Sequence, residues 1–207
     1  MRSSVKRRHT TRALFAMRRT RTVFLLVVVL FGATQAAAWE ERPSPATTQD
    51  IACNIVGDTV PGGICAEAGA GALIAAAENS AATMEWDGRR WSKEEGFTSP
   101  GSMVGATNLT DGRPNQALML ARKSVAARYC AGLRLGGYKD WYLPARDELA
   151  LLRTHQEKIG GFFATPYWSS SEFSATSAWM VDFSSGASFI FPKETKRPVR
   201  CVRRLAL

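Results

Sequence analysis

Four cysteines are the residues whose chemistry depends most on where the chain works. They are Cys53, Cys65, Cys130 and Cys201. An even number of cysteines in an exported chain predicts disulfide bonds, and four cysteines allow three pairings. We favour a local Cys53–Cys65 bond and a long-range Cys130–Cys201 bond. Zinc binding is the competing use, but the sequence has neither a Cys-x-x-Cys pair nor a histidine near these residues, so we predict no metal site.

The C-terminal stretch carries a strong local charge. Between residues 193 and 204, six basic residues accompany one acid, Glu194, which leaves a charge of +5. Such a surface attracts sulfate or carboxylate groups of polysaccharides, and arginine can hold them through two hydrogen bonds. The alternative is an edge strand whose charges guard it against aggregation. The basic residues predicted to bind a ligand are Lys193, Lys196, Arg197, Arg200, Arg203 and Arg204.

Two tryptophans, Trp168 and Trp179, complete the predicted ligand-binding set. Tryptophan rings can provide a stacking surface for sugars, but they also dominate the cores of small domains. Trp179 alternates with Met180, and Val181 alternates with Asp182, which is the period of a strand with one buried face. This alternation favours core packing over sugar stacking.

Residues suited to catalysis are few. His155 is the one histidine beyond the N-terminal segment, and it lies on a predicted helix without a recognisable catalytic partner. The run 169–171 consists of serines outside a Gly-x-Ser-x-Gly setting, so we expect its hydroxyls to bond nearby backbone groups. Four acids offer oxygen ligands for calcium, but their spacing does not bring them together: Asp140, Asp147, Glu172 and Asp182. We predict no enzyme activity and no cofactor.

The N-terminal segment, residues 1–38, reads as a signal peptide. A basic stretch precedes the apolar run 23–31, and Ala36–Ala38 supplies a small-residue cleavage site before Trp39. The apolar run is shorter than the roughly 20 residues that span a bilayer, so an uncleaved anchor is the less favoured alternative. We expect an exported protein of the periplasm, cell surface or exterior, which meets a membrane only through this segment during export.

Cleavage of this segment changes the charge of the protein. Of the 27 Lys and Arg residues, eight lie in residues 1–38, which contain no acid, so 19 basic residues remain against 18 acidic ones. The mature chain is therefore nearly neutral. This balance argues against a nucleic-acid partner, which the basic pI of the whole chain would otherwise suggest.

The elements that must position these residues predict an α+β domain. Residues 39–55 form a short mature leader, and the domain follows over residues 56–207. One helix is expected from about Gly112 to Gly132 and a second over residues 145–158. Period-two patterns predict strands near residues 73–77, 83–86, 167–173, 178–183, 188–191 and 199–205, the last ones forming a terminal antiparallel sheet.

The second half of the chain resembles the Lcl C-terminal domain family, named for the C-terminal domain of a bacterial collagen-like adhesin. The resemblance covers about residues 57–205 and is strong from Asp111 onward. It rests on motifs that occur in a fixed order: Thr110–Asn115, Arg128–Cys130, Gly136–Pro144, Arg146–Leu149, Tyr167–Glu172, Ala178–Trp179, Phe183–Gly186 and Val199–Arg203.

This resemblance implies a C-type-lectin-like fold, with two helices, a small twisted antiparallel sheet and a disulfide from the first helix to the last strand. That disulfide matches Cys130–Cys201. The family's best-understood member is similar to an adhesin that binds sulfated polysaccharides. This chain lacks the Glu-Pro-Asn, Gln-Pro-Asp and Trp-Asn-Asp motifs of calcium-dependent lectins, which puts calcium-bridged sugar binding in doubt.

Together these observations predict an exported, non-catalytic binding or adhesion domain whose ligand is an anionic polysaccharide. The alternative is a structural or assembly protein of the cell envelope, which would bind an envelope protein instead. A third hypothesis is an enzyme, because lectin-like folds also carry the formylglycine-generating oxidases. That chemistry needs reactive cysteines, which a Cys130–Cys201 disulfide would remove.

Overall fold

The computed structural model describes residues 53–87 and 103–205, all of which lie in one unit of the chain, residues 46–207. The predicted signal peptide and most of the predicted leader lie outside the described residues. In chain order, the elements are β1 (Thr59–Val60), β2 (Gly63–Glu67), β3 (Leu73–Ala76), α1 (Gly112–Ala121), α2 (Val125–Gly132), α3 (Arg146–Thr154), α4 (Gln156–Ile159), β4 (Pro166–Glu172), β5 (Ser177–Asp182), β6 (Ser188–Pro192) and β7 (Val202–Arg204). The predicted α+β class is confirmed.

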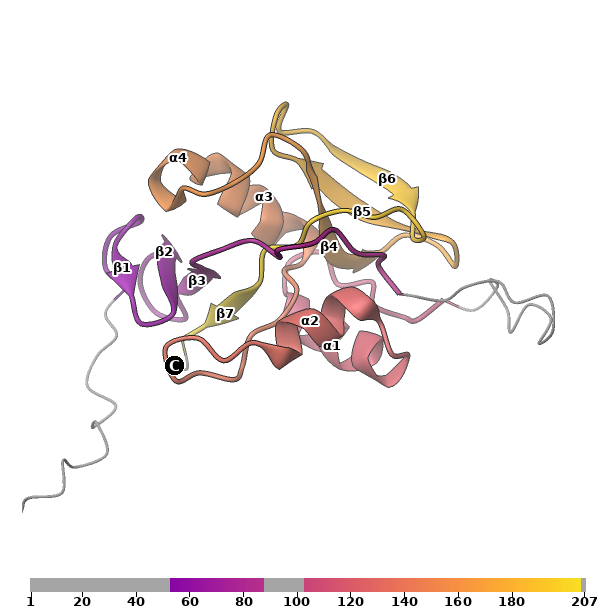
Figure 1. Cartoon of the computed structure of the whole chain (residues 1–207), viewed down its shortest axis with the longest axis horizontal. Helices are drawn as coiled ribbons and strands as arrows, with labels where there is room; N and C mark the ends of the chain where they lie inside the picture. The colour runs from indigo at the N-terminus through magenta and orange to yellow at the C-terminus, as the bar shows by residue number, and fades with distance from the viewer. Residues whose placement is uncertain (1–52, 88–102, 206–207) are drawn as a thin grey trace, which may run out of the picture. The chain divides into compact units, whose positions relative to one another are not determined.

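The strands form two antiparallel sheets (Figure 1). In the first, the order is β1-β2-β3-β7, so the last strand of the chain pairs with an early one. β3 is an apolar Leu-Ile-Ala-Ala run that is buried at every position, and it needs a hydrogen-bonding partner on each side. The prediction of one terminal sheet is therefore wrong, because the C-terminal strand completes the N-terminal sheet.

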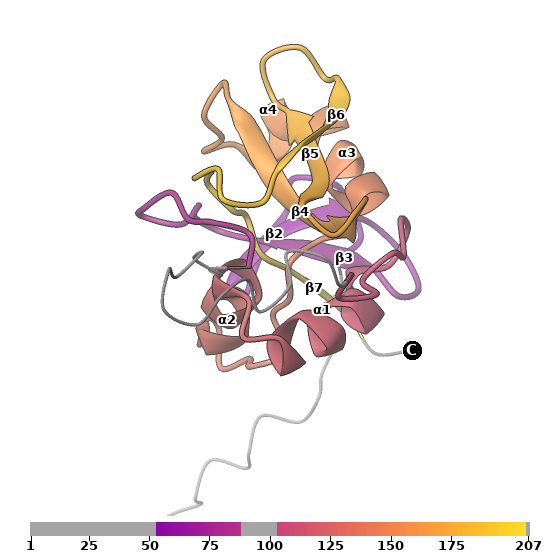
Figure 2. The ribbon, with the colours of Figure 1, turned by 90° about the vertical axis from the view of Figure 1, so that its right-hand side faces the viewer.

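The second sheet, in the order β4-β5-β6, is an antiparallel meander (Figure 2). Its second hairpin turns at Ser185–Gly186, as expected, and Gly186 has the positive φ of 83° that such a turn favours. The strand predicted at residues 83–86 is reduced to an isolated bridge between Met84 and Arg197. That segment still follows the C-terminal part of the chain, because the Ser80 amide donates to the Val199 carbonyl and the Trp86 amide to the Lys193 carbonyl, both at 2.9 Å.

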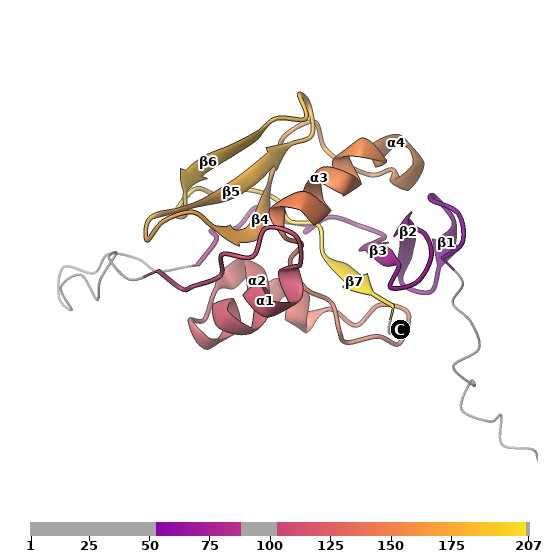
Figure 3. The ribbon, with the colours of Figure 1, turned by 180° about the vertical axis from the view of Figure 1, so that it is seen from behind.

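The first predicted helix is broken into α1 and α2, which lie side by side (Figure 3). Lys123 adopts a positive φ of 60°, which ends α1, and Ser124 then accepts a hydrogen bond from the Ala127 amide as the N-cap of α2. The second predicted helix is also broken, at His155, into α3 and α4. Gly160 ends it at a φ of 74°, as its sequence position predicted. The described residues thus form four helices where two were expected.

The core lies on both faces of β3. Ile74 and Ala76 pack in a cluster with Trp86, Trp168 and residues of α1 and α2. Leu73 and Ala75 pack in a second cluster with Leu149 and Leu152 of α3 and with Tyr167 of β4. One strand thus joins the helical pair on one side to α3 on the other.

Both favoured disulfides are present. Cys53 bonds to Cys65 of β2, and Cys130 of α2 bonds to Cys201, which directly precedes β7. All four cysteines are at least 98% buried.

Among the described residues, no helix is long and apolar enough to cross a membrane.

Candidate functional site

The six C-terminal cations do not form one exposed surface. Lys193 is buried, and its Nζ donates to Glu172 Oε1 at 2.6 Å and to the Ala175 carbonyl at 2.9 Å. The same ammonium lies 4.6 Å from the centre of the Trp86 ring. Glu172 also accepts hydrogen bonds from the Val104 and Gly105 amides, both at 2.8 Å. Lys193 therefore neutralises a buried carboxylate and has no free charge to offer a ligand.

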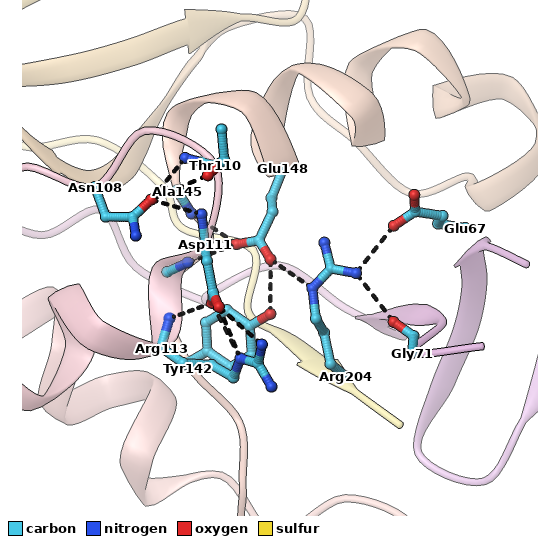
Figure 4. Close-up of polar contacts among 11 residues, drawn as sticks. Glu67, Gly71, Asn108, Thr110, Asp111, Arg113, Tyr142, Ala145, Glu148 and Arg204 are labelled. Atoms are coloured by element: carbon cyan, nitrogen blue, oxygen red, sulfur yellow. Dashed lines mark hydrogen bonds and ion pairs between the residues drawn. The ribbon is translucent and has the colours of Figure 1, made fainter. Parts of the chain in front are cut away.

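Arg203 and Arg204, on β7, are also engaged inside the domain. Arg203 forms a two-armed ion pair with Asp140 and stacks over the Tyr138 ring at 3.7 Å. Arg204 bridges two carboxylates, with Nε 3.0 Å from Glu148 Oε1 and Nη1 3.0 Å from Glu67 Oε2 (Figure 4). Both guanidinium groups connect β7 to neighbouring segments.

Glu148, the third residue of α3, is the centre of the polar network in Figure 4. Its carboxylate accepts hydrogen bonds from the Gly112 amide, the Ala145 amide, the Tyr142 hydroxyl and Arg204 Nε, at 2.8 to 3.0 Å. Burial raises the pKa of the Tyr142 phenol, and the adjacent carboxylate adds to this effect. The phenol thus stays protonated and donates. This network connects the N-termini of α1 and α3 to β7. The motifs Thr110–Asn115, Gly136–Pro144 and Arg146–Leu149 each contribute a residue to it, so these motifs stabilise the fold.

Arg200 is fully buried, and it forms no ion pair with a carboxylate of the described residues. Its Nη1 donates to Asn79 Oδ1 at 3.0 Å, and its guanidinium stacks over the Phe162 ring at 4.5 Å. Burial lowers the pKa of Arg200 to about 10, because the charged form loses solvation. This arginine, too, is unavailable to a ligand on the surface.

The two tryptophans of the predicted set differ in their surroundings. Trp168 is fully buried, and its Nε1 donates to the carbonyls of Met84 and Thr195. Trp179 is half-buried, packs edge-on against the exposed Phe173 at 5.6 Å, and has the Arg146 guanidinium 5.1 Å from its ring centre. Trp168 therefore has a core role, whereas Trp179 retains a partly open ring.

Lys196 and Arg197 are the members of the C-terminal set that reach a surface hollow. This hollow, which we name the basic pocket, has a volume of about 170 Å³. It lies between three segments of the chain and is lined by Ser80, Ala81, Ala82, Thr83, Phe163, Thr165, Lys196, Arg197 and Pro198. Lys196 is exposed, and Phe163 is 58% exposed at the same hollow. Cations, hydroxyl groups and an open aromatic ring thus meet at one place.

The charges of the basic pocket are not neutralised within the described part of the chain. Neither Lys196 nor Arg197 forms an ion pair there. Arg197 Nη1 donates to the Lys196 carbonyl at 3.2 Å, but its Nε is buried and has no hydrogen-bond partner. Arg200 Nε and Arg203 Nη1 are likewise buried without a hydrogen-bond partner, so the lack of an ion pair among the described residues is what distinguishes the cations of the basic pocket from Arg203.

Backbone hydrogen bonds hold the walls of the basic pocket together. Met84 and Arg197 exchange amide–carbonyl bonds of 2.9 and 3.0 Å, and the Val199 amide donates to Ser80 Oγ at 3.0 Å. Trp168 Nε1 donates to the carbonyls of Met84 and Thr195, which adjoin the pocket-lining residues Thr83 and Lys196, and so links the two walls. The cations therefore stand on a preorganised backbone rather than on a free loop.

The other residues with chemical potential lie apart from this pocket. His155 is half-buried at the junction of α3 and α4. The three serines of β4 are buried: Ser169 and Ser171 donate to backbone carbonyls, and Ser170 accepts from the Asn115 side chain. Their predicted bonding to backbone groups is confirmed for Ser169 and Ser171. Within residues 53–87 and 103–205, no three His, Cys, Asp or Glu side chains are grouped as a metal site would require.

Each of the four acids considered for calcium has a different partner. Glu172 faces Lys193, Asp140 faces Arg203, and Asp147 faces Arg146 at 2.7 Å. Asp182 accepts bonds from Ser184 and Ser185 in the β5–β6 turn, and the Ser184 bonds lower its pKa. The acids therefore serve as separate local partners.

The sequence did not identify Thr83, Phe163 and Thr165 as neighbours of the basic residues. Thr83 lies 113 positions before Lys196, Phe163 and Thr165 lie about 30 positions before it, and none carries a local signal of function. The backbone bonds between Met84 and Arg197 bring Thr83 to Lys196, and the Trp168 amide, which donates to the Pro198 carbonyl at 3.2 Å, holds the chain after Thr165 against the same stretch.

Comparison with known proteins agrees with the motifs. No curated protein matches the chain. The Lcl C-terminal domain family matches residues 65–203, more than half of the chain. This match includes both cysteines of the long-range disulfide and the whole Glu148 network apart from Arg204. The chain therefore belongs to the Lcl C-terminal domain family.

Proposed function

We propose that this protein is an exported, non-catalytic binding domain whose ligand is an anionic polysaccharide, held at the basic pocket. The observation that carries the proposal is that Lys196, Arg197 and the exposed ring of Phe163 line the same hollow. Two cations suit a sulfate or carboxylate group, and an exposed ring suits the apolar face of the attached sugar. The small volume fits one such group, and the rest of the polymer extends over the surface.

A non-catalytic role is supported by the state of the most reactive side chains. All four cysteines of the chain are buried in disulfides, so none offers the thiol that an oxidase of the formylglycine-generating type requires. The hydroxyl groups of the buried serines of β4 form hydrogen bonds within the domain. Export is supported by the two disulfides, which persist in oxidising compartments.

The test is binding of the exported protein to heparin, measured by calorimetry at low and at moderate salt. We expect binding that weakens as salt screens the charges. The double variant Lys196→Gln with Arg197→Gln should bind about ten-fold more weakly, which corresponds to about 1.4 kcal/mol. The matched control is Arg122→Gln with Arg128→Gln, which removes the same number of positive charges from exposed positions but leaves the pocket intact.

Two results contradict the proposal. The first is the absence of binding to heparin and to any member of a panel of acidic glycans at low salt. The second is an equal loss of heparin affinity in the pocket variant and in the control variant, because this would show attraction by overall charge rather than by the pocket.

A further inference from the structure

Helix α1 has its apolar side toward solvent. Its exposed apolar positions, which we name the α1 face, are Pro114, Ala117, Leu118, Leu120 and Ala121, and Arg113 is the one exposed polar residue of the helix. Leu118 is 42% exposed and Leu120 is 36% exposed. None of these five side chains can form a hydrogen bond. This is the reverse of an ordinary surface helix, whose polar side chains face water.

The two amide side chains of α1 are turned inward instead. Asn115 is buried and donates to the Asn108 carbonyl at 2.7 Å and to Ser170 Oγ at 3.2 Å. Gln116 is buried, donates to the Ala127 carbonyl at 2.8 Å, and accepts from the Leu143 amide at 3.1 Å. The fold thus uses the polar side of α1 as internal connections, and this orientation leaves the apolar side exposed.

Basic residues flank α1 along the chain. From Gly112 to Lys139 the chain has six basic residues and no acidic one, and all six are exposed: Arg113, Arg122, Lys123, Arg128, Arg134 and Lys139. Arg113 stands in the first turn of α1, and Arg122 and Lys123 directly follow its last residue. Within the described residues, only Arg113 of these six forms an ion pair, with Asp111 at 2.8 Å.

From the apolar face and its cationic border, we propose that α1 docks on the surface of a lipid bilayer with acidic headgroups. Leucines without polar neighbours fit the boundary between headgroups and acyl chains, and the cations fit lipid phosphates. At about 15 Å, the ten-residue helix lies on a membrane rather than across it.

A specific protein partner is the less suitable occupant. It would have to match a helix face that offers no hydrogen-bonding group, whereas a bilayer needs no such match. The proposal departs from the expectation that only the signal segment meets a membrane. It does not rest on the polysaccharide ligand, because the basic pocket is formed by other segments, beside β4 and the C-terminal stretch.

The test is sedimentation of the exported protein with lipid vesicles, after its N-terminus has been determined by mass spectrometry. We expect it to bind phosphatidylglycerol vesicles much more tightly than phosphatidylcholine vesicles, and to dissociate at high salt. The variant Leu118→Ser with Leu120→Ser should bind about ten-fold more weakly. Arg122→Gln should bind about five-fold more weakly.

Two control variants are matched to these changes. Ile190→Ser with Phe191→Ser removes two exposed apolar side chains from β6, and Lys158→Gln removes one exposed cation from α4. Both controls should keep wild-type vesicle binding. Because every variant has the same N-terminus, any contribution of that region cancels in the comparison.

Three outcomes would overturn the proposal. They are no binding of the wild type to phosphatidylglycerol vesicles, equal binding by the wild type and the leucine variant, and capture of a protein partner that the leucine variant loses while vesicle binding stays unchanged. Heparin binding should be retained in the leucine variant, so a failure of this proposal is distinguishable from a failure of the polysaccharide proposal.

Discussion

At the scale of single residues, basic side chains close together in the sequence have different roles. Lys193 and Lys196 are three positions apart, yet one is 3% exposed and paired with Glu172 while the other is exposed at the basic pocket. A buried ion pair depends on both partners, because the survivor of a broken pair remains as an unpaired charge in a poorly solvated site. An exposed lysine carries no such penalty.

These environments predict unequal losses of stability for two similar substitutions. Lys193→Met leaves the Glu172 carboxylate buried and should lower the free energy of unfolding by about 3 kcal/mol, although the amides of residues 104 and 105 still solvate it. Lys196→Met should change that free energy by less than about 0.5 kcal/mol. Urea unfolding at neutral pH measures both. Equal stability of the two variants would show that the buried pair contributes nothing.

At the scale of elements, the interruption between α1 and α2 positions the helical pair. Ser124 makes three connections at this point: its amide donates to the Met119 carbonyl at 3.0 Å, its hydroxyl accepts from the Ala127 amide, and its hydroxyl donates to the Trp86 carbonyl. Ser124 is fully buried, so its hydroxyl cannot exchange these bonds for water. The interruption therefore links two helices and the segment that carries Trp86.

Removal of this hydroxyl should destabilise the domain. We expect Ser124→Ala to lower the free energy of unfolding by about 2 kcal/mol, because α2 loses its N-cap and the Trp86 carbonyl loses its donor. The matched control is Ser188→Ala on exposed β6, which should stay within about 0.5 kcal/mol of the wild type. Chemical unfolding of the three proteins checks this, and a loss as small as that of the control would contradict the capping role.

At the scale of the whole molecule, the two disulfides constrain the chain over different lengths. The Cys53–Cys65 bond joins residues 12 positions apart, and the Cys130–Cys201 bond joins residues 71 positions apart. The longer bond ties α2 to the segment before β7, and so closes the part of the chain that contains α3, α4 and the whole β4–β6 sheet. A cross-link over a longer loop removes more freedom from the unfolded chain.

Replacement of each disulfide by alanines should therefore have unequal costs. Cys130→Ala with Cys201→Ala should lower the free energy of unfolding by about 4 kcal/mol, and Cys53→Ala with Cys65→Ala by about 3 kcal/mol. Calorimetry or urea unfolding under non-reducing conditions measures the two losses. A smaller loss for the long-range pair than for the local pair would contradict the importance of the long loop.

Local patterns were sufficient to predict much of the fold. Period-two runs predicted β4 and β5, which bury one or both of their faces, and also β6, whose positions stay largely exposed. Gly160 and Gly186 predicted the ends that need a positive φ. The break at Lys123 was not predicted, because helical spacing continues through it and lysine rarely adopts a positive φ. The pairing of β7 with β3 was not predicted either, since it joins residues about 130 positions apart.

By itself, the sequence determined the α+β class, the family and the two favoured disulfides, because each depends on residue types and their order along the chain. Only the tertiary structure decided which charges reach solvent. Strand pairing turned Lys193, Arg200, Arg203 and Arg204 toward internal partners and left Lys196 and Arg197 at a hollow with Phe163. The packing of α1 likewise turned its amides inward and its leucines outward. The physical reason is that a charged or apolar side chain can contact an outside ligand only where the fold gives it no partner inside the domain.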